Sequence, residues 1–174
     1  DFYDFQMHKL KEVHADPHPG NFLFGEDGSL GVIDFGCIKK LPQGFYERYF
    51  KIMEPAIVDR DDEFESLLYE LQFLLGADSH KEVDHFKEIY KQVLLLLGKP
   101  FFQEEFDFSE KAYFEEIYGM SEIFQKDKMV RNARAGRGPK DAIYLNRTYF
   151  GLYSILHSLG AKVQTRSAVG ELFT

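Results

Sequence analysis

Four segments after residue 42 repeat apolar residues at intervals of three and four, the spacing of one helix face. The segments are residues 43–58, 62–75, 82–97 and 141–159, and Pro55 is expected to kink or end the first. A further helix is expected from Ser109. Glycines at 76, 98 and 160 follow three of the segments directly, where glycine commonly ends a helix. The expected buried residues are Phe45, Tyr49, Met53, Phe64, Leu67, Leu68, Leu71, Leu74, Leu75, Val83, Phe86, Ile89, Tyr90, Val93, Leu94, Leu97, Leu145, Tyr149, Leu152, Leu156 and Leu159. The chain is predicted to be mainly α.

The remaining predicted structure lies near the start of the chain. "NFLF" (21–24) and "LGVID" (30–34) have strand composition, and the Asp27-Gly28 step between them is a strong hairpin signal. Residues 1–12 are predicted to be the end of a helix, with Phe2, Phe5 and Leu10 buried. The chain is thus expected to be one domain with a small β-hairpin within residues 13–36 and a helical part over 43–166. Its 174 residues, 44% of them hydrophobic, suffice for one core.

Composition excludes several classes of protein. A formal charge of −8 argues against nucleic acid as a partner. The single cysteine, Cys37, excludes an internal disulfide and fits a reducing compartment. No run approaches the ~20 apolar residues of a membrane-spanning helix, so a cytoplasmic or peripheral membrane location is expected. The first residue is Asp1 rather than Met, and the chain is expected to be part of a longer protein.

The stretch "HADPHPGNFLFGEDGSLGVIDFG" (14–36) carries the chemistry-bearing residues. Asp16 precedes the first predicted strand, Asn21 begins it, and Asp34 ends the second strand across the hairpin. Folding the hairpin is expected to bring all three together. Carboxylate and amide oxygens suit Mg²⁺, which takes few protein ligands and keeps waters or phosphate oxygens. An Asp with an Asn five residues on, followed by a metal-binding Asp in "DFG", is the order used in phosphoryl transfer by kinases. Asn21 and Asp34 are the predicted metal ligands, and Asp16 is the predicted catalytic residue.

Two other interpretations remain open for this stretch. Asp16 and Asn21 could cap turns, because their side chains bond nearby backbone. His14, Asp16 and His18 could form a zinc site, since imidazole and carboxylate are plausible zinc ligands. A role in orienting the loop through hydrogen bonds is the favoured interpretation for His14 and His18.

"HADPHPGN" followed by "IDFG" resembles the UbiB/AarF family of atypical kinases, and "YLNRTYFGLYSILHSLGA" (144–161) is similar to the closing helix of that family. The resemblance implies the C-terminal, helical lobe of a protein-kinase-like α+β fold, with Mg²⁺ and ATP as cofactors. It places the catalytic aspartate on Asp16 and the metal-binding residues on Asn21 and Asp34. By analogy with kinase-like folds, Leu23 and Ile33 are candidates for the floor of the adenine pocket; hairpin core is the alternative for both.

Three departures from a protein kinase shape the functional hypothesis. No N-terminal lobe with its nucleotide loop, strand lysine and partner glutamate precedes Asp1, so that lobe is an expected partner and the isolated chain is expected to be inactive. Only "CIKKLPQ" separates Gly36 from the next predicted helix, which leaves no room for a peptide-binding platform. Ala15 stands where many protein kinases have an arginine. The last two features favour a small-molecule or lipid substrate, or ATP hydrolysis, and the family resemblance implies a link to ubiquinone or isoprenoid-lipid metabolism.

Two alternative functions are weighed. One is a phosphotransferase of the aminoglycoside- or choline-kinase kind, which usually has Gly in place of Ala15 and lacks Pro17. The other is a catalytically silent scaffold that binds a lipid or a partner.

Two further segments have two interpretations each, and one further residue is expected to form an ion pair. The segment "FFQEEFDFSEKAYF" (101–114) is a solvated loop with anchoring rings or a partner contact. The basic residues 126–140 are a solvated loop or a site for phosphate or lipid head groups, which would allow peripheral membrane contact. Arg147 is expected to pair with an acid in the core that the sequence does not identify.

Overall fold

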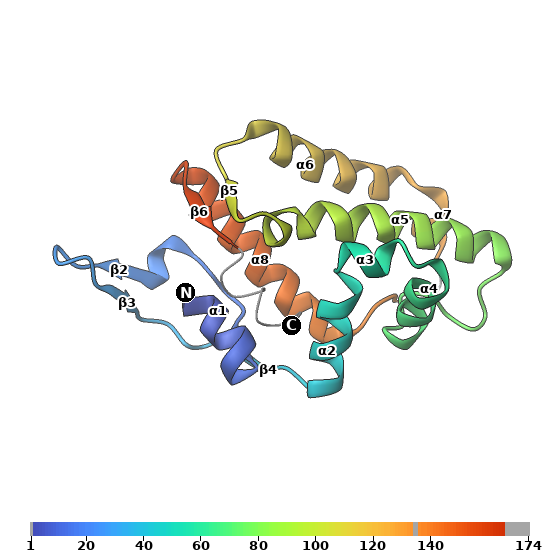
Figure 1. Ribbon diagram of the computed structural model, residues 1–174, viewed down its shortest axis with the longest axis horizontal. Helices are drawn as coiled ribbons and strands as arrows, with labels where there is room; N and C mark the ends of the chain where they lie inside the picture. The colour runs from blue at the N-terminus through green and yellow to red at the C-terminus, as the bar shows by residue number, and fades with distance from the viewer. Residues whose placement is uncertain (1, 134–135, 166–174) are drawn as a thin grey trace.

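The computed structural model describes residues 2–133 and 136–165 and is mainly helical, with small antiparallel strand pairs (Figure 1). The predicted fold class is confirmed. The longest helices are α5 (His80–Gly98) and α8 (Lys140–Ser158), joined by α6 (Lys111–Lys126) and α7 (Lys128–Asn132). The shorter helices are α1 (Phe2–Asp4), α2 (Gln43–Ile52), α3 (Pro55–Val58) and α4 (Asp61–Glu70).

Local chemistry explains where the main helices begin and end. The Ser79 side chain accepts the Glu82 N–H while the Glu82 carboxylate accepts the Ser79 N–H, a capping box that starts α5. Gly98 ends α5, as predicted, and a 3₁₀ turn (Lys99–Phe102) follows. The prediction of helix over residues 71–75 was wrong. Gln72 adopts a left-handed backbone, φ 59°, which turns the chain away from α4.

The core predicted from helical spacing is largely buried. Its fully buried members include Phe64, Leu68 and Leu74, and from α8 Leu145. Leu159 was predicted to be buried but is exposed, because it follows the end of α8. Thirteen Phe and Tyr rings are buried among the described residues, which accounts for nearly half of the high content of Phe and Tyr.

The N-terminal segment differs from its prediction. After α1 the chain forms a π-helical turn (Phe5–Leu10), which changes the residues that face inward. Tyr3 and Met7 are buried, whereas Phe5 and Leu10 are exposed and Phe2 is half-buried. The prediction of a buried Phe5 and Leu10 was wrong because it assumed a regular α-helical repeat.

Three strand pairs are present among the described residues, where the sequence predicted one. The predicted hairpin joins β2 (Phe22–Phe24) to β3 (Leu30–Val32) and projects from the body of the molecule (Figure 1). The other pairs join β1 (Glu12–His14) to β4 (Ile38–Lys40) and β5 (Glu105–Asp107) to β6 (Lys162–Gln164). Each of their strands has three residues, which is too short for alternation to show in the sequence.

Candidate active site

The β1–β4 ladder fixes both ends of the segment that carries the candidate residues. His14 pairs with Ile38, and the Ala15 N–H donates to the Cys37 carbonyl at 2.8 Å. Residues 14–18, here called the catalytic loop, then lead into a 3₁₀ turn (Pro19–Asn21) and directly into β2. The Asp16 side chain is exposed on this loop.

Asn21 and Asp34 lie at the open end of the hairpin, but Asp34 does not end β3 as predicted. The last ladder bond runs from the Ile33 N–H to the Asn21 carbonyl at 3.1 Å, so Asn21 lies opposite Ile33 and Asp34 follows one residue later. The Asn21 side-chain N–H donates to the Asp16 backbone carbonyl at 3.1 Å. Backbone pairing and this side-chain bond therefore bring the segments that carry Asp16, Asn21 and Asp34 to one end of the hairpin.

The bonds that these polar side chains make leave oxygen atoms for a ligand. The amide nitrogen of Asn21 is bound to Asp16, so the amide oxygen is the end that a metal would use. One Asp34 oxygen, Oδ1, accepts the Gly36 N–H at 2.7 Å in a tight Asx turn, and Oδ2 is the other carboxylate oxygen. A Cβ at Gly36 would lie 3.1 Å from Asp34 Oδ1, so glycine permits this close turn. Asp34 therefore caps the turn to Gly36 with one carboxylate oxygen, and its side chain is exposed to solvent.

The candidate adenine-floor residues share a hairpin face with Asn21. In an antiparallel pair, residues opposite one another point to the same side and alternate residues share a face. The register places Leu23 opposite Gly31 and Asn21 opposite Ile33, so Asn21, Leu23 and Ile33 lie on one face. Leu23 is 56% exposed and Ile33 is 59% exposed. Neither is hairpin core in this structure.

The two histidines of the stretch lie in different environments. His14 is fully buried, and its Nδ1 lies 2.9 Å from the Tyr3 hydroxyl. Burial, with the nearby Asp16 carboxylate as a smaller cause, raises the pKa of Tyr3 to about 12. His18 is exposed, and its Nδ1 accepts the Gly20 N–H at 3.1 Å. The His14 ring thus contacts the Tyr3 side chain, and the His18 ring contacts the backbone of Gly20.

The zinc interpretation receives no support. His14 is buried whereas Asp16 and His18 are exposed. Within residues 2–133 and 136–165, no group of three or more His, Cys, Asp or Glu side chains is placed to hold a metal ion.

Sequence reasoning left the partner of Arg147 open, and the structure identifies it as Asp16. Arg147 Nη2 on α8 donates to Asp16 Oδ1 at 2.8 Å. The two side chains are 54% and 51% exposed, so the pair lies at the surface. The expectation that Arg147 pairs with an acid in the core was wrong. The two residues are 131 positions apart. No local pattern could have indicated the pairing.

The basic segment is not a uniform cationic surface. Arg137 binds both oxygens of Asp78 at 2.8 and 2.7 Å and its side chain is buried with that partner, while Lys126 pairs with Glu122. Arg134 lies outside the described residues. In the acidic and aromatic segment, Phe106 and Phe108 are buried, which gives it the anchoring rings expected of a solvated loop.

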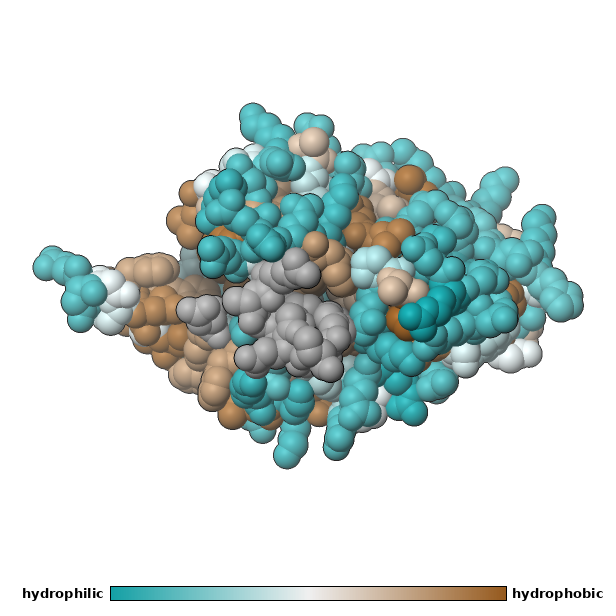
Figure 2. All heavy atoms as spheres, in the orientation of Figure 1, coloured by the Kyte–Doolittle hydropathy of each residue, from teal (hydrophilic) through white to brown (hydrophobic). Residues whose placement is uncertain are grey.

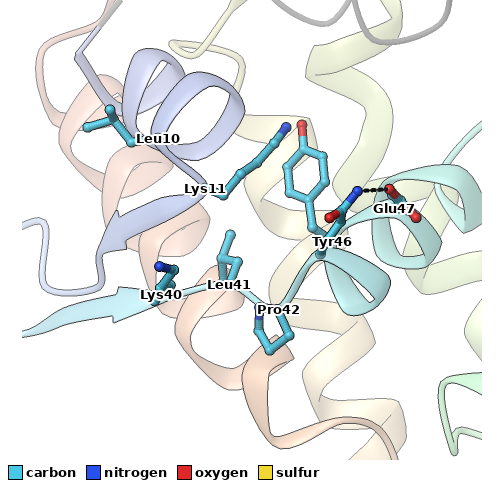
Figure 3. Close-up of a pocket in the computed structure, with 8 residues that line it drawn as sticks. Leu10, Lys11, Lys40, Leu41, Pro42, Tyr46 and Glu47 are labelled. Atoms are coloured by element: carbon cyan, nitrogen blue, oxygen red, sulfur yellow. Dashed lines mark hydrogen bonds between the residues drawn. The ribbon is translucent and has the colours of Figure 1, made fainter.

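A cavity of about 840 Å³ opens between the N-terminal segment and the start of α2 (Figure 3). Lys11, Leu41 and Tyr46 are among its lining residues, and the Lys11 ammonium lies 3.5 Å from the centre of the Tyr46 ring. None of the candidate site residues lines it. It is therefore separate from the end of the hairpin that carries Asp16, Asn21 and Asp34.

A helical body with a catalytic-type loop and a projecting hairpin defines the helical lobe of a protein-kinase-like fold. A solved structure with the same fold is the complex of Rv3197 with erythromycin from Mycobacterium tuberculosis. It is similar over 98% of this chain and 40% of that chain, with a TM-score of 0.64 and 23% identity. This likeness concerns the fold.

Residues 1–65, which contain the whole candidate site, match the model of the ABC1 atypical kinase-like domain. The chain is 21% identical to the atypical kinase COQ8B, mitochondrial, of Danio rerio over 97% of this chain and 26% of that protein. Over 35% of this chain and 9% of the other, it is 41% identical to protein ACTIVITY OF BC1 COMPLEX KINASE 3, chloroplastic, of Arabidopsis thaliana. These matches support membership of the ABC1, or UbiB/AarF, family of atypical kinases. It spans about a quarter of the length of its zebrafish relative. No helix among the described residues is long and apolar enough to cross a membrane.

Proposed function

We propose that this chain is the C-terminal lobe of an atypical kinase or ATPase that uses Mg²⁺ and ATP, linked to ubiquinone or isoprenoid-lipid metabolism. The observation that carries the proposal is the meeting of Asp16, Asn21 and the segment of Asp34 at the open end of one hairpin. The order and identity of these residues are those used in phosphoryl transfer.

The oxygen atoms present fit a magnesium ion. The Asn21 amide is turned by its bond to Asp16 so that its oxygen remains for a ligand, and Asp34 offers the second oxygen of an exposed carboxylate. Hard oxygen donors of this kind hold Mg²⁺ in nucleotide sites. A bound Mg²⁺ would supply positive charge to offset the negative charge of the phosphates. Asn21 and Asp34 are the residues that would hold it.

Asp16 is proposed to accept the proton of the attacking hydroxyl or water. As that oxygen bonds to the γ-phosphorus, the bond from phosphorus to the bridging oxygen breaks and its electron pair leaves with ADP. The proton passes to the carboxylate of Asp16. Because the Asp16 side chain is exposed, an acceptor molecule can reach it from solvent. Positioning of this kind, together with electrostatic stabilisation, accounts for most catalysis of phosphoryl transfer.

The exposed hairpin face is proposed to carry the adenine ring. Leu23 and Ile33 lie on the same face as Asn21, so a nucleotide whose phosphates reach Asn21 can lay its base along them. Their exposure of more than half leaves apolar surface for a flat ring to cover.

The partner proposed for the hairpin is the N-terminal lobe of the same protein. Exposed large apolar side chains are concentrated in residues 1–40, and Figure 2 shows hydrophobic surface between the polar hairpin tip and the body. The exposed members are Phe5, Leu10, Leu23, Phe24, Leu30, Ile33, Phe35 and Ile38. A concentration of this kind marks an interaction surface. Because a lobe over this face would supply the remaining nucleotide contacts, the isolated chain is proposed to be inactive.

The substrate is proposed to be a small molecule or a lipid. β4 starts two residues after Gly36, and α2 begins at Gln43. This short connection leaves no segment for the platform on which protein kinases bind a peptide.

Thermal unfolding of the full-length protein with increasing Mg²⁺-ATP tests the proposal. Binding to the folded state raises the unfolding temperature by mass action, and both Mg²⁺ and ATP should be required. Phosphate release stimulated by a quinone-precursor phenol or by lipid vesicles is the expected activity. An unfolding temperature that does not change at millimolar Mg²⁺-ATP would favour the silent scaffold. Phosphorylation of an amino alcohol or an aminoglycoside would favour the small-molecule phosphotransferase.

A further inference from the structure

The segment "YLNRTYFG" of α8 (144–151) supplies none of the proposed ligands, yet it meets the catalytic loop at three positions. The Thr148 hydroxyl, fully buried, lies 3.5 Å from the His14 carbonyl oxygen. Arg147 binds the Asp16 carboxylate at 2.8 Å. These contacts join the last long helix to the first 16 residues of the chain.

The third contact is a close approach of backbones. A Cβ added at Gly151 would lie 2.4 Å from Pro17 Cγ and 2.9 Å from the Pro17 carbonyl oxygen. Real Cβ atoms essentially never show such distances, so the two segments can touch in this way only with glycine at position 151. Residues 14, 16 and 17 of the loop thus each lie against one residue of α8. The Thr148 hydroxyl donates its proton to the Tyr144 carbonyl at 2.9 Å, so the contacts that hold the loop are those of Arg147 and Gly151.

An exposed ion pair such as Arg147–Asp16 adds little to the stability of a protein. Its effect here is on geometry, because the Asp16 side chain otherwise projects from a loop into solvent. With Oδ1 held by the guanidinium, Oδ2 is the carboxylate oxygen left for an acceptor. A catalytic group misplaced by about 1 Å can lose about a hundred-fold in rate.

We infer that α8 is a positioning element for the catalytic loop, in which Arg147 orients the Asp16 carboxylate and Gly151 seats the loop backbone. This inference rests on the proposed function of Asp16. It gives a role to the segment "LNRTYFG", which resembles the closing helix of the UbiB/AarF family and supplies none of the proposed catalytic or metal-binding groups.

Steady-state ATP turnover of the full-length protein tests the role of Arg147. Arg147→Ala is expected to lower kcat about ten-fold or more while the KM for ATP stays unchanged, because the proposed nucleotide contacts lie on the hairpin. Arg147→Lys should recover part of the loss. Since the site is half exposed, added guanidinium ion at non-denaturing concentration should also restore turnover of Arg147→Ala. The matched control is Arg48→Ala, which removes another exposed ion pair, to Glu70, and should leave kcat unchanged.

The double variant separates this inference from the proposed function. If Arg147 acts through Asp16, Arg147→Ala should cause no further loss in an Asp16→Asn background. A loss in Asp16→Asn but none in Arg147→Ala would overturn the inference and leave the proposed function standing. Turnover unchanged in Asp16→Asn would overturn both.

Amide hydrogen exchange gives a readout that needs no turnover. In Arg147→Ala and in Gly151→Ala the amides of Ala15 and Asn21 should exchange several-fold faster than in the wild type, while amides in α5 do not change. If Gly151→Ala fails to fold, Arg147→Ala alone decides. Exchange at Ala15 and Asn21 that stays at the wild-type rate in the folded variants would show that α8 does not hold the loop.

Discussion

Replacing Asp78 by alanine should lower the free energy of unfolding by about 3–5 kcal/mol, the cost of breaking a buried ion pair by removing one partner. Arg137 donates from Nη1 and Nη2 to the two Asp78 oxygens, and the side chains are only 10% and 6% exposed. Asp78 also accepts the Leu75 N–H at 2.7 Å. Removing the carboxylate therefore leaves a buried guanidinium and a backbone donor without their partner. For a domain of this size the loss corresponds to a fall of roughly 6–20 °C in Tm.

Urea unfolding at neutral pH measures this loss, with Glu115→Ala, an exposed helix position, as the control. The Arg137 hydrogen bonds hold the pKa of Asp78 below its ordinary value. The stabilisation is therefore present above the unfolded pKa of about 3.9 and is lost as the pH falls through the folded pKa. The wild type and Asp78→Ala should thus become more alike in acid. A loss below about 1 kcal/mol at neutral pH, the value of an exposed pair, would refute the reasoning. An ion pair as weak as that would also leave Arg137 available to bind a phosphate or a lipid head group.

Three further predictions follow from single residues. Asp34→Asn should abolish Mg²⁺-dependent nucleotide binding in the full-length protein yet change unfolding by less than about 1 kcal/mol, since the exposed amide can still accept the Gly36 N–H; a large loss of stability in calorimetry would instead make the carboxylate structural. Burial, with Lys11 and Lys9 nearby, lowers the pKa of His8 to about 4. The free energy of unfolding should therefore have its full value above about pH 6.5 and fall by roughly 2–3 kcal/mol towards pH 4. A His8→Gln variant whose free energy of unfolding keeps the same dependence on pH would contradict this. Phe64→Ala should cost about 3–5 kcal/mol in urea unfolding, because the ring is fully buried, and a cost under 1 kcal/mol would show that the site is solvated.

The helical part of the fold was predictable because its signals are local. Apolar spacing, the glycine stop at 98 and the proline at 55 mark α5 and the break between α2 and α3 within a few residues. The β1–β4 and β5–β6 pairs were not predictable, since each joins short strands that are far apart in the sequence. The π-helical turn at Phe5–Leu10 was missed for another reason. Its repeat differs from 3.6 residues, so spacing indicated the wrong buried face.

The candidate site was predictable to the extent that it lies within one hairpin. The Asp27-Gly28 step predicted the hairpin but not its register, because five residues (25–29) and not two connect Phe24 to Leu30. Asn21 therefore lies opposite Ile33 and not opposite Asp34. The role of Leu23 and Ile33 in binding adenine stays a prediction, although their exposure excludes a place in the hairpin core. The contribution of α8 could not be predicted, because Arg147 and Asp16 meet only through tertiary packing.

Paramagnetic broadening by Mn²⁺-ATP, with Mn²⁺ in place of Mg²⁺, tests most directly whether this hairpin end holds a metal–nucleotide complex. In the ¹⁵N-labelled full-length protein, the amide signals of residues 16, 21 and 34 should broaden first, and signals from α5 and α6 should stay sharp. Asp34→Asn should abolish the broadening. Broadening centred elsewhere in the chain, or none at these three residues at saturating Mn²⁺-ATP, would contradict the account.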